Sequence, residues 1–215
     1  MLLQLQQIKL GYPQKQGFKT IIDSFSLNLD RGYNACLLGA SGCGKTTILR
    51  AVAGFEPIYA GQILLDNQLI ADKTRMVPPE QRHIGMMFQD YALFPHLTTE
   101  QNIAFGLSHL SKDHAKQITH EMLELIGLPH YAKAYPHELS GGQQQRIALA
   151  RAIAPAPKLL LLDEPFSNLD VDTREKLAVE VKDILKEKQL SAILVTHNRV
   201  EADVFADHIV YVKNN

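Results

Sequence analysis

Residues 39–46 read Gly39-Ala40-Ser41-Gly42-Cys43-Gly44-Lys45-Thr46 and fit the pattern G-x-x-x-x-G-K-[ST] of a phosphate-binding loop. A short apolar run, residues 35–38, precedes the loop as expected for a strand buried on both faces. A helix carrying apolar side chains follows as far as Gly54. This strand–loop–helix context disfavours the alternative of a chance glycine-rich turn with a surface lysine. The loop therefore predicts binding of a nucleoside triphosphate, without choosing among the many classes of P-loop protein.

Each part of this loop has an expected role. The glycines let backbone N–H groups and the helix N-terminus face the phosphates. Lys45 would reach the β- and γ-phosphates, the Thr46 hydroxyl would bind Mg²⁺, and Cys43 is expected to be a small residue that fits. We expect alkylation of Cys43 to hinder nucleotide binding. The predicted nucleotide-binding residues of the loop are Gly39, Ala40, Ser41, Gly42, Cys43, Gly44, Lys45, Thr46 and Thr47.

Polar side chains follow three apolar runs that read as strands. Asp163 and Glu164 end the run Leu159 to Leu162; Asp163 is expected to hold Mg²⁺ and Glu164 to act as general base. The alternative is a pair of carboxylates that merely ends a strand in solvent. His197 follows residues 194–196 and is a candidate sensor of the γ-phosphate, although a lone histidine there is more often structural.

Gln89 follows the apolar run 86–88 in the same way. Its amide could contact Mg²⁺ or the attacking water. The candidate catalytic residues are Glu164, His197 and Gln89, and the candidate metal ligands are Thr46, Gln89 and Asp163.

The pattern of apolar residues predicts an α/β fold. Leu3 and Leu5 alternate, with Gln7 as a weaker third member, and alternation recurs over residues 25–29, so the N-terminal flank is expected to be antiparallel β. Residues from about 98 to 152 change to helical spacing. Strands expected at 158–162, 192–195 and 209–212 alternate with helices near 177–185 and 200–206, which indicates parallel βαβ units. We therefore expect a mostly parallel sheet, an antiparallel flank and a helical insertion.

Composition excludes several classes of protein. The chain has 215 residues with 22 Lys+Arg and 23 Asp+Glu, so neither a wholly basic nucleic-acid surface nor an acidic tail is indicated. No apolar run approaches the roughly 20 residues that span a bilayer. The first residues lack the basic and continuously apolar regions of a signal peptide. Two cysteines are too few for a disulfide framework or a four-ligand zinc site.

A second anion site is predicted at Leu139-Ser140-Gly141-Gly142-Gln143. Ser140 is a good N-cap, and the adjacent glycines expose backbone N–H groups at the positive end of a helix dipole. One chain with two phosphate-binding surfaces suggests a nucleotide held between two copies of the protein.

With this motif the sequence resembles the ATP-binding subunit of an ABC transporter, over essentially the whole chain. The resemblance rests on motifs that occur in the family's order: residues 39–46, Gln89, residues 139–143, residues 159–164, Ser167-Asn168-Leu169-Asp170 and His197. It implies a P-loop NTPase core spanning 1–215, a helical subdomain at about 90–155, and a reaction that hydrolyses ATP with Mg²⁺. The chain stops at Lys213-Asn214-Asn215, where relatives continue, so no C-terminal regulatory domain is expected.

The resemblance also assigns roles across a homodimer. Tyr12 would stack on adenine, the alternative being an ordinary aromatic at a strand end. Ser140, Gly141, Gly142 and Gln143 would contact the γ-phosphate of ATP held by the opposite subunit. Asp170 would link the two sites.

The resemblance implies partners at the cytoplasmic face of the plasma membrane. Residues Asp90 to His96 are similar to the segment that docks a separate membrane permease, with exposed Tyr91 and Phe94 as apolar anchors; the alternative is ordinary local core. A complete system would include an extracytoplasmic solute-binding protein and no nucleic acid. The run 78–98 is similar to importers of ferric iron, polyamines, sulfate and sugars, with ferric iron as the first expectation.

The sequence departs from the importer pattern at one position, and two other classes of protein are alternatives to the transport ATPase. Asn198 follows His197 where these importers usually carry aspartate, which implies softer contacts around the histidine. A non-transport ABC ATPase of DNA repair or translation usually has two nucleotide modules or a long coiled-coil insertion, and neither is visible here. A P-loop kinase or GTPase does not require the motif at residues 139–143, so the presence of this motif disfavours these classes. Solute specificity would reside in the membrane and binding-protein partners, so this chain does not identify the solute.

Overall fold

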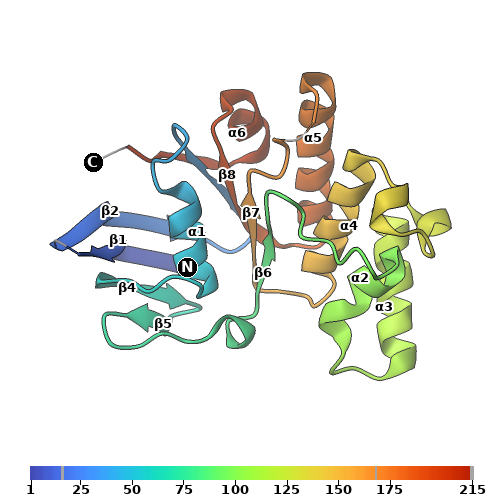
Figure 1. Ribbon diagram of the computed structural model, residues 1–215, viewed down its shortest axis with the longest axis horizontal. Helices are drawn as coiled ribbons and strands as arrows, with labels where there is room; N and C mark the ends of the chain where they lie inside the picture. Colours follow the sequence, from blue (N-terminus) through green and yellow to red (C-terminus); the bar gives the residue numbers. More distant parts are fainter. Residues whose placement is uncertain (16, 168, 214–215) are drawn as a thin grey trace.

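The computed structural model describes residues 1–15, 17–167 and 169–213, and its centre is a parallel sheet (Figure 1). The strands lie in the order β6-β7-β8-β3-β9, and every pairing between neighbours is parallel. β3, β7 and β8 are buried throughout, as expected for strands covered on both faces. The strands are β3 (Asn34–Leu38), β6 (Ile84–Met87), β7 (Leu159–Asp163), β8 (Ser191–Thr196) and β9 (His208–Tyr211).

A second, antiparallel sheet flanks the first, in the order β2-β1-β4-β5. Its strands are β1 (Leu3–Gln14), β2 (Gly17–Leu29), β4 (Ala60–Leu65) and β5 (Gln68–Asp72). The expectation that Gln7 continues the inward alternation of Leu3 and Leu5 is wrong. Gln7 adopts a left-handed φ of 47° and is exposed, because the register of β1 shifts between Leu5 and Ile8.

The helices occupy two regions. In Figure 1, α1 lies between the two sheets, whereas α2, α3 and α4 gather on the opposite side of the central sheet. None of the helices in the described part of the chain combines the length and apolar character that crossing a bilayer requires. The helices are α1 (Lys45–Ala53), α2 (Thr99–Ala104), α3 (Lys112–Leu125), α4 (Gly141–Ile153), α5 (Val171–Glu187) and α6 (Arg199–Phe205). Short 3₁₀ turns lie at Pro79–Gln81, Phe105–Leu107, Pro129–Tyr131 and Pro136–Glu138.

Alternate side chains of the central strands enter two separate cores. Leu160, Leu162 and Leu194 join a cluster with residues of α3, α4, α5 and α6. Leu161 and Ile193 point the other way, into a cluster that contains α1 and the antiparallel sheet. The carboxyl ends of the parallel strands are thereby fixed at one edge, between α1 and the helical region.

Candidate nucleotide-binding site

The phosphate-binding loop joins β3 to α1, as predicted. Gly42 and Gly44 adopt φ values of 80° and 97°, which only glycine tolerates without strain. The Lys45 side chain is 4% exposed, and its Nζ donates to the carbonyl oxygens of Gly39 and Ala40, both at 2.8 Å. Its ammonium therefore lies against the backbone of the loop. Cys43 is also buried, which fits the expectation of a small side chain that fills space.

Thr46 and Asp163 meet at the end of β7. The Thr46 hydroxyl donates to Asp163 Oδ1 at 2.8 Å. A hollow of about 470 Å³ is lined by Thr46, Arg50, Phe88, Gln89, Asp90 and Asp163. Burial raises the pKa of Asp163, against the lowering effect of the bond from Thr46. The three side chains predicted as metal ligands thus lie around one hollow.

These donors suit Mg²⁺. A hydroxyl, a carboxylate and an amide supply the oxygen ligands that a small hard cation prefers, with room for water and phosphate oxygens. A cation would also offset the cost of keeping the carboxylate of Asp163 charged in a buried position. Among the described residues, no group of three or more His, Cys, Asp or Glu side chains could hold a metal ion.

Glu164 and His197 form a pair beside this hollow. The Glu164 backbone takes a left-handed φ of 43°, and its N–H donates to the carbonyl of Val195 in β8. Glu164 Oε2 lies 3.3 Å from Nδ1 of His197. The Glu164 side chain is 17% exposed and that of His197 is 48% exposed, so solvent can reach the pair. The ends of β7 and β8 therefore bring the two residues together as predicted from their positions.

The turn that carries His197 is braced from behind. The Thr196 hydroxyl donates to Glu201 of α6 and accepts from the N–H of Asn198. Asn198 caps α6 by accepting from the N–H of Val200 at 2.8 Å. An asparagine caps a helix as well as an aspartate does, so the departure at this position preserves the cap. Glu201 was not among the residues predicted from the sequence, because nothing local distinguishes it from the charged residues Arg199 and Asp203 of the same short helix.

The residues of the second predicted anion site begin α4. Ser140 is the N-cap, as predicted: its hydroxyl accepts from the N–H of Gln143, while the Gln143 side chain accepts from the N–H of Ser140. Both hydrogen bonds join residues at the start of α4, and neither involves the phosphate-binding loop at Gly39–Thr46. Asp170 caps α5 by accepting from Thr173 N at 3.0 Å, and hydrogen bonds from the Thr173 side chain and backbone lower the pKa of Asp170. Asn168, quoted with the same motif, lies outside the described residues.

Tyr12 lies near the end of β1. Its ring is 41% exposed, and its hydroxyl donates to Glu56 at 3.4 Å. The side chain is therefore available for stacking on a planar group, and its role stays a prediction.

The expectation that Tyr91 is exposed is wrong. Tyr91 is 5% exposed and belongs to the core that contains α3 and α4. Its left-handed φ of 61° turns the chain so that the ring points inward, and burial raises its pKa. Phe94 is half-buried and packs against the tilted ring of Phe105, which is 56% exposed. Arg151 donates to the carbonyls of Tyr91 and Ala92 and lies over the Phe94 ring.

Arg82, which binds the C-terminal end of α1, was not among the residues predicted from the sequence. Its side chain is 2% exposed and donates from Nη1 to the carbonyls of Ala51 and Val52 at the end of α1. No local pattern distinguishes it from a surface arginine, because the α1 carbonyls that accept from its Nη1 lie about 30 residues earlier in the chain.

The fold and the site together define a P-loop nucleotide-binding protein: a parallel sheet carries the phosphate-binding loop and an Asp–Glu pair at one edge. The ABC transporter family matches residues 22–167, and the chain belongs to this family. It is 47% identical over 210 residues to the putrescine transport ATP-binding protein PotG of Escherichia coli K12, covering 97% of this chain and 54% of the relative. It is 46% identical over 195 residues to the Fe(3+) ions import ATP-binding protein FbpC of Haemophilus influenzae, covering 90% and 56%.

Solved structures agree with this family. The dimeric structure of MJ0796, a bacterial ABC transporter cassette, matches with a TM-score of 0.85 and 29% identity, covering 99% of this chain and 94% of that one. A dimeric post-hydrolysis state of MJ0796 bound to ADP and Pi matches with a TM-score of 0.84 and 29% identity, with the same coverage. The α/β fold predicted from sequence is that of these cassettes. The chain spans about half the length of the curated relatives that it matches.

Proposed function

We propose that this chain hydrolyses ATP as the motor subunit of an ABC importer. The observation that carries the proposal is the arrangement at the ends of β7 and β8. There Asp163 accepts from Thr46 of the phosphate-binding loop, and Glu164, the next residue, lies 3.3 Å from His197. Two carboxylates with different partners suit two tasks, one at the metal and one at the attacking water.

In this proposal the loop residues Gly39 to Thr47 bind the phosphates, and Tyr12 stacks on adenine. Thr46, Asp163 and Gln89 would hold Mg²⁺, which neutralises charge on the β- and γ-phosphates when bound. Glu164 takes a proton from the water that attacks the γ-phosphate. His197 positions the Glu164 carboxylate and senses the γ-phosphate, and Thr196 with Glu201 braces the turn that carries it.

A pair of chains would complete each site. Ser140, Gly141, Gly142 and Gln143 start a capped helix whose N–H groups suit an anion, yet their own contacts are within that helix end. We infer that they contact ATP held by the partner subunit, and that Asp170 links the two sites. The dimeric MJ0796 cassettes support this arrangement.

The remaining partners follow from the relatives. A separate membrane permease would dock near residues 90–96, where Phe94, Phe105 and Arg151 line a shallow hollow. The proposed docking surface thus includes Phe94, Phe105 and Arg151, and it does not include the buried Tyr91. The chain would act at the cytoplasmic face of the plasma membrane, with an extracytoplasmic solute-binding protein completing the system. The relatives named for putrescine and for Fe(3+) both concern cations, so we propose a cationic solute, with ferric iron as the first candidate.

The test is ATP hydrolysis by the purified chain and by Glu164→Gln. We expect the substitution to reduce phosphate release by about 100-fold or more, because general bases contribute factors of this order. Binding of ATP should persist, since the phosphate-binding loop is unchanged. Glu80→Gln, at an exposed position on the 3₁₀ turn Pro79–Gln81, is the matched control and should hydrolyse ATP normally. Full turnover by Glu164→Gln would overturn the assignment of the general base.

A further inference from the structure

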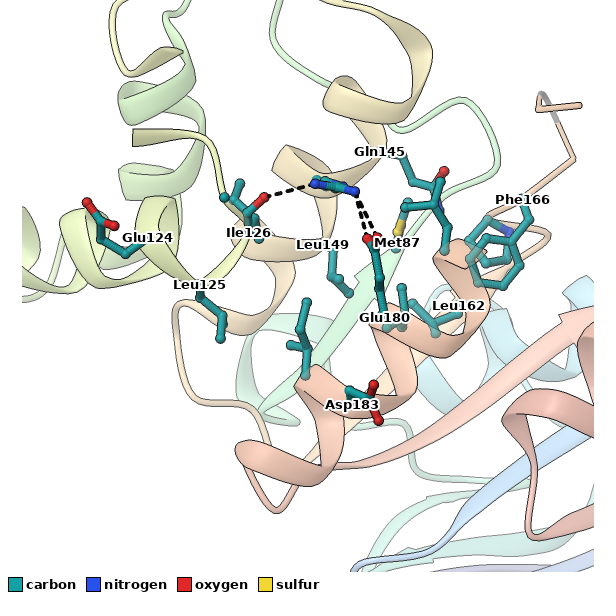
Figure 2. Close-up of a pocket in the computed structure, with 16 residues that line it drawn as sticks. Met87, Glu124, Leu125, Ile126, Gln145, Leu149, Leu162, Phe166, Glu180 and Asp183 are labelled. Carbon is teal, nitrogen blue, oxygen red and sulfur yellow. Dashed lines mark hydrogen bonds and ion pairs between the residues drawn. The ribbon is translucent and has the colours of Figure 1, made fainter. Parts of the chain in front are cut away.

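A pocket separate from the proposed nucleotide site lies between α3, α4 and α5 (Figure 2). Its volume is about 330 Å³, enough for a ring with a short side chain and within the range of small-molecule sites. Its apolar walls come from Met87, Leu125, Leu149, Leu162, Leu177 and Ile184. The pocket is therefore a preformed apolar site whose walls belong to three helices and two strands of the central sheet.

Gln145 of α4 is an unusual part of this wall. The residue is 2% exposed, and neither its amide nitrogen nor its amide oxygen has a hydrogen-bond partner in the described part of the chain. Figure 2 shows Gln145 beside Met87 and Phe166, at the end of the pocket away from Glu124. A buried polar group without a partner costs about 1–3 kcal/mol. A ligand with a hydrogen-bonding group at this inner end would remove that cost.

The mouth of the pocket is acidic. Glu124, Glu180 and Asp183 line it together with a single cation, Arg146. Arg146 pairs with Glu180 at 2.7 Å, and its Nη1 donates to the carbonyl of Ile126. Within the described ranges, neither Glu124 nor Asp183 forms an ion pair. The mouth thus carries two uncompensated negative charges, which favour a cation and disfavour an anion.

We propose that this pocket binds a small amphiphilic cation. Such a ligand has a ring-sized apolar body, a protonated amine that lies in the acidic mouth, and a hydrogen-bonding group that reaches Gln145. A purely apolar molecule would leave Gln145 without a partner, and a carboxylate would be repelled at the mouth. The site goes beyond the proposed ATP hydrolysis and does not depend on it, because none of the predicted nucleotide-binding residues lines the pocket.

The test uses tyramine, which has the amine, the ring and a hydroxyl at the far end, on the full chain without nucleotide. Two analogues each lack one polar group: tyrosol replaces the amine with a hydroxyl, and phenethylamine lacks the phenol hydroxyl. Titrations followed by NMR chemical shifts should give a Kd for tyramine of roughly 0.1–1 mM, as expected for about ten heavy atoms. We expect tyrosol and phenethylamine each to bind about three- to tenfold more weakly, the range that one exposed ion pair or one hydrogen bond supplies.

Variants locate the two polar contacts. Glu124→Gln with Asp183→Asn, both at exposed positions, should weaken tyramine to the level of tyrosol and leave tyrosol unchanged. Glu175→Gln, exposed on α5 but outside the pocket, is the control and should bind tyramine normally. Gln145→Leu should remove the difference between tyramine and phenethylamine.

Three results would overturn the proposal, and none depends on ATP hydrolysis. The first is equal affinity of the unchanged chain for tyramine and tyrosol. The second is unchanged tyramine binding by the variant with both mouth carboxylates neutralised, a variant whose exposed substitutions should leave folding intact. The third is no binding of tyramine at concentrations well above 1 mM, which exceeds the expected range of roughly 0.1–1 mM.

Discussion

Glu201 is a carboxylate that the fold buries behind the proposed catalytic pair. Its side chain is 3% exposed and accepts from the Thr196 hydroxyl. Burial raises the pKa of Glu201, and the bond from Thr196 and the charge of Arg174 offset only part of that effect. Burial of the Glu201 carboxylate therefore costs folding free energy, while its hydrogen bond with Thr196 fixes the turn that carries His197.

This burial predicts a dependence of stability on pH. Since the pKa of Glu201 is raised in the folded chain, the folded state keeps the proton to higher pH than the unfolded state does. The contribution to stability is present below the ordinary value of 4.5 and is lost as the pH rises through the raised pKa. Glu201→Gln keeps an oxygen acceptor for Thr196 and removes the titration.

We therefore expect the unfolding free energy of Glu201→Gln to fall less than that of the parent between pH 5 and pH 8. Urea titrations of both chains across this range, in the absence of nucleotide, measure the difference. A constant difference at every pH would contradict the assignment. Glu187→Gln, at an exposed position near the end of α5, serves as the control and should follow the parent.

Sequence patterns identify residues at the ends of strands better than residues that act through distant contacts. Asp163 and His197 were predicted because each directly follows an apolar run that reads as a buried strand. Arg82 and Glu201 were missed because their burial is decided by segments that pack against them from elsewhere. A charged side chain in a short element reads as solvent-exposed unless its neighbours in space are known.

At the scale of elements, α1 is held at both ends. Its N-terminus continues the phosphate-binding loop, and its C-terminal carbonyls accept from Arg82 Nη1 at 2.8 Å. Arg82 Nε also donates to the carbonyl of Val77 at 2.7 Å, which ties α1 to the segment after β5. Burial lowers the pKa of Arg82 to about 10, so the guanidinium stays charged at neutral pH and complements the negative end of the helix dipole.

Arg82→Met should therefore destabilise the chain, because the substitution removes the donors to the carbonyls of Ala51, Val52 and Val77. We expect a loss of about 3 kcal/mol or more in unfolding free energy, measured by urea titration. Arg75→Met is the matched control at an exposed position and should change stability by less than about 0.5 kcal/mol. Equal stability of the two variants would show that Arg82 does not hold α1.

The type of most elements was predictable, whereas local irregularities were not. Apolar runs identified β3, β7 and β8, because strands buried on both faces need no polar alternation. The shift of register at Gln7 and the inward turn at Tyr91 depend on left-handed backbone conformations of non-glycine residues, which no composition signals. These two positions account for the wrong predictions about which side chains face solvent.

At the scale of the whole molecule, we propose that each chain supplies two partial anion sites, which two copies together complete. The loop at Gly39–Thr46 lies at the start of α1, between the sheets, while Ser140 starts α4 in the helical region beyond the central sheet (Figure 1). Because helix N-termini favour anions, we propose that a nucleotide bound on one copy presents its phosphates to the second site of another copy.

This arrangement predicts that ATP joins two chains when hydrolysis is blocked. Glu164→Gln should bind ATP without consuming it, so the γ-phosphate keeps bridging the two copies, and sedimentation should show a doubled mass with ATP and Mg²⁺ but not with ADP. Adding Ser140→Arg should restore the single mass, because the larger side chain occupies the space in which the partner's phosphate would lie at the start of α4. Ser108→Arg, in the loop after the 3₁₀ turn Phe105–Leu107, is the matched control and should leave the ATP-dependent pairing intact. If Glu164→Gln binds ATP and remains a single chain, or if Ser140→Arg still pairs, then the second anion site does not act across two copies.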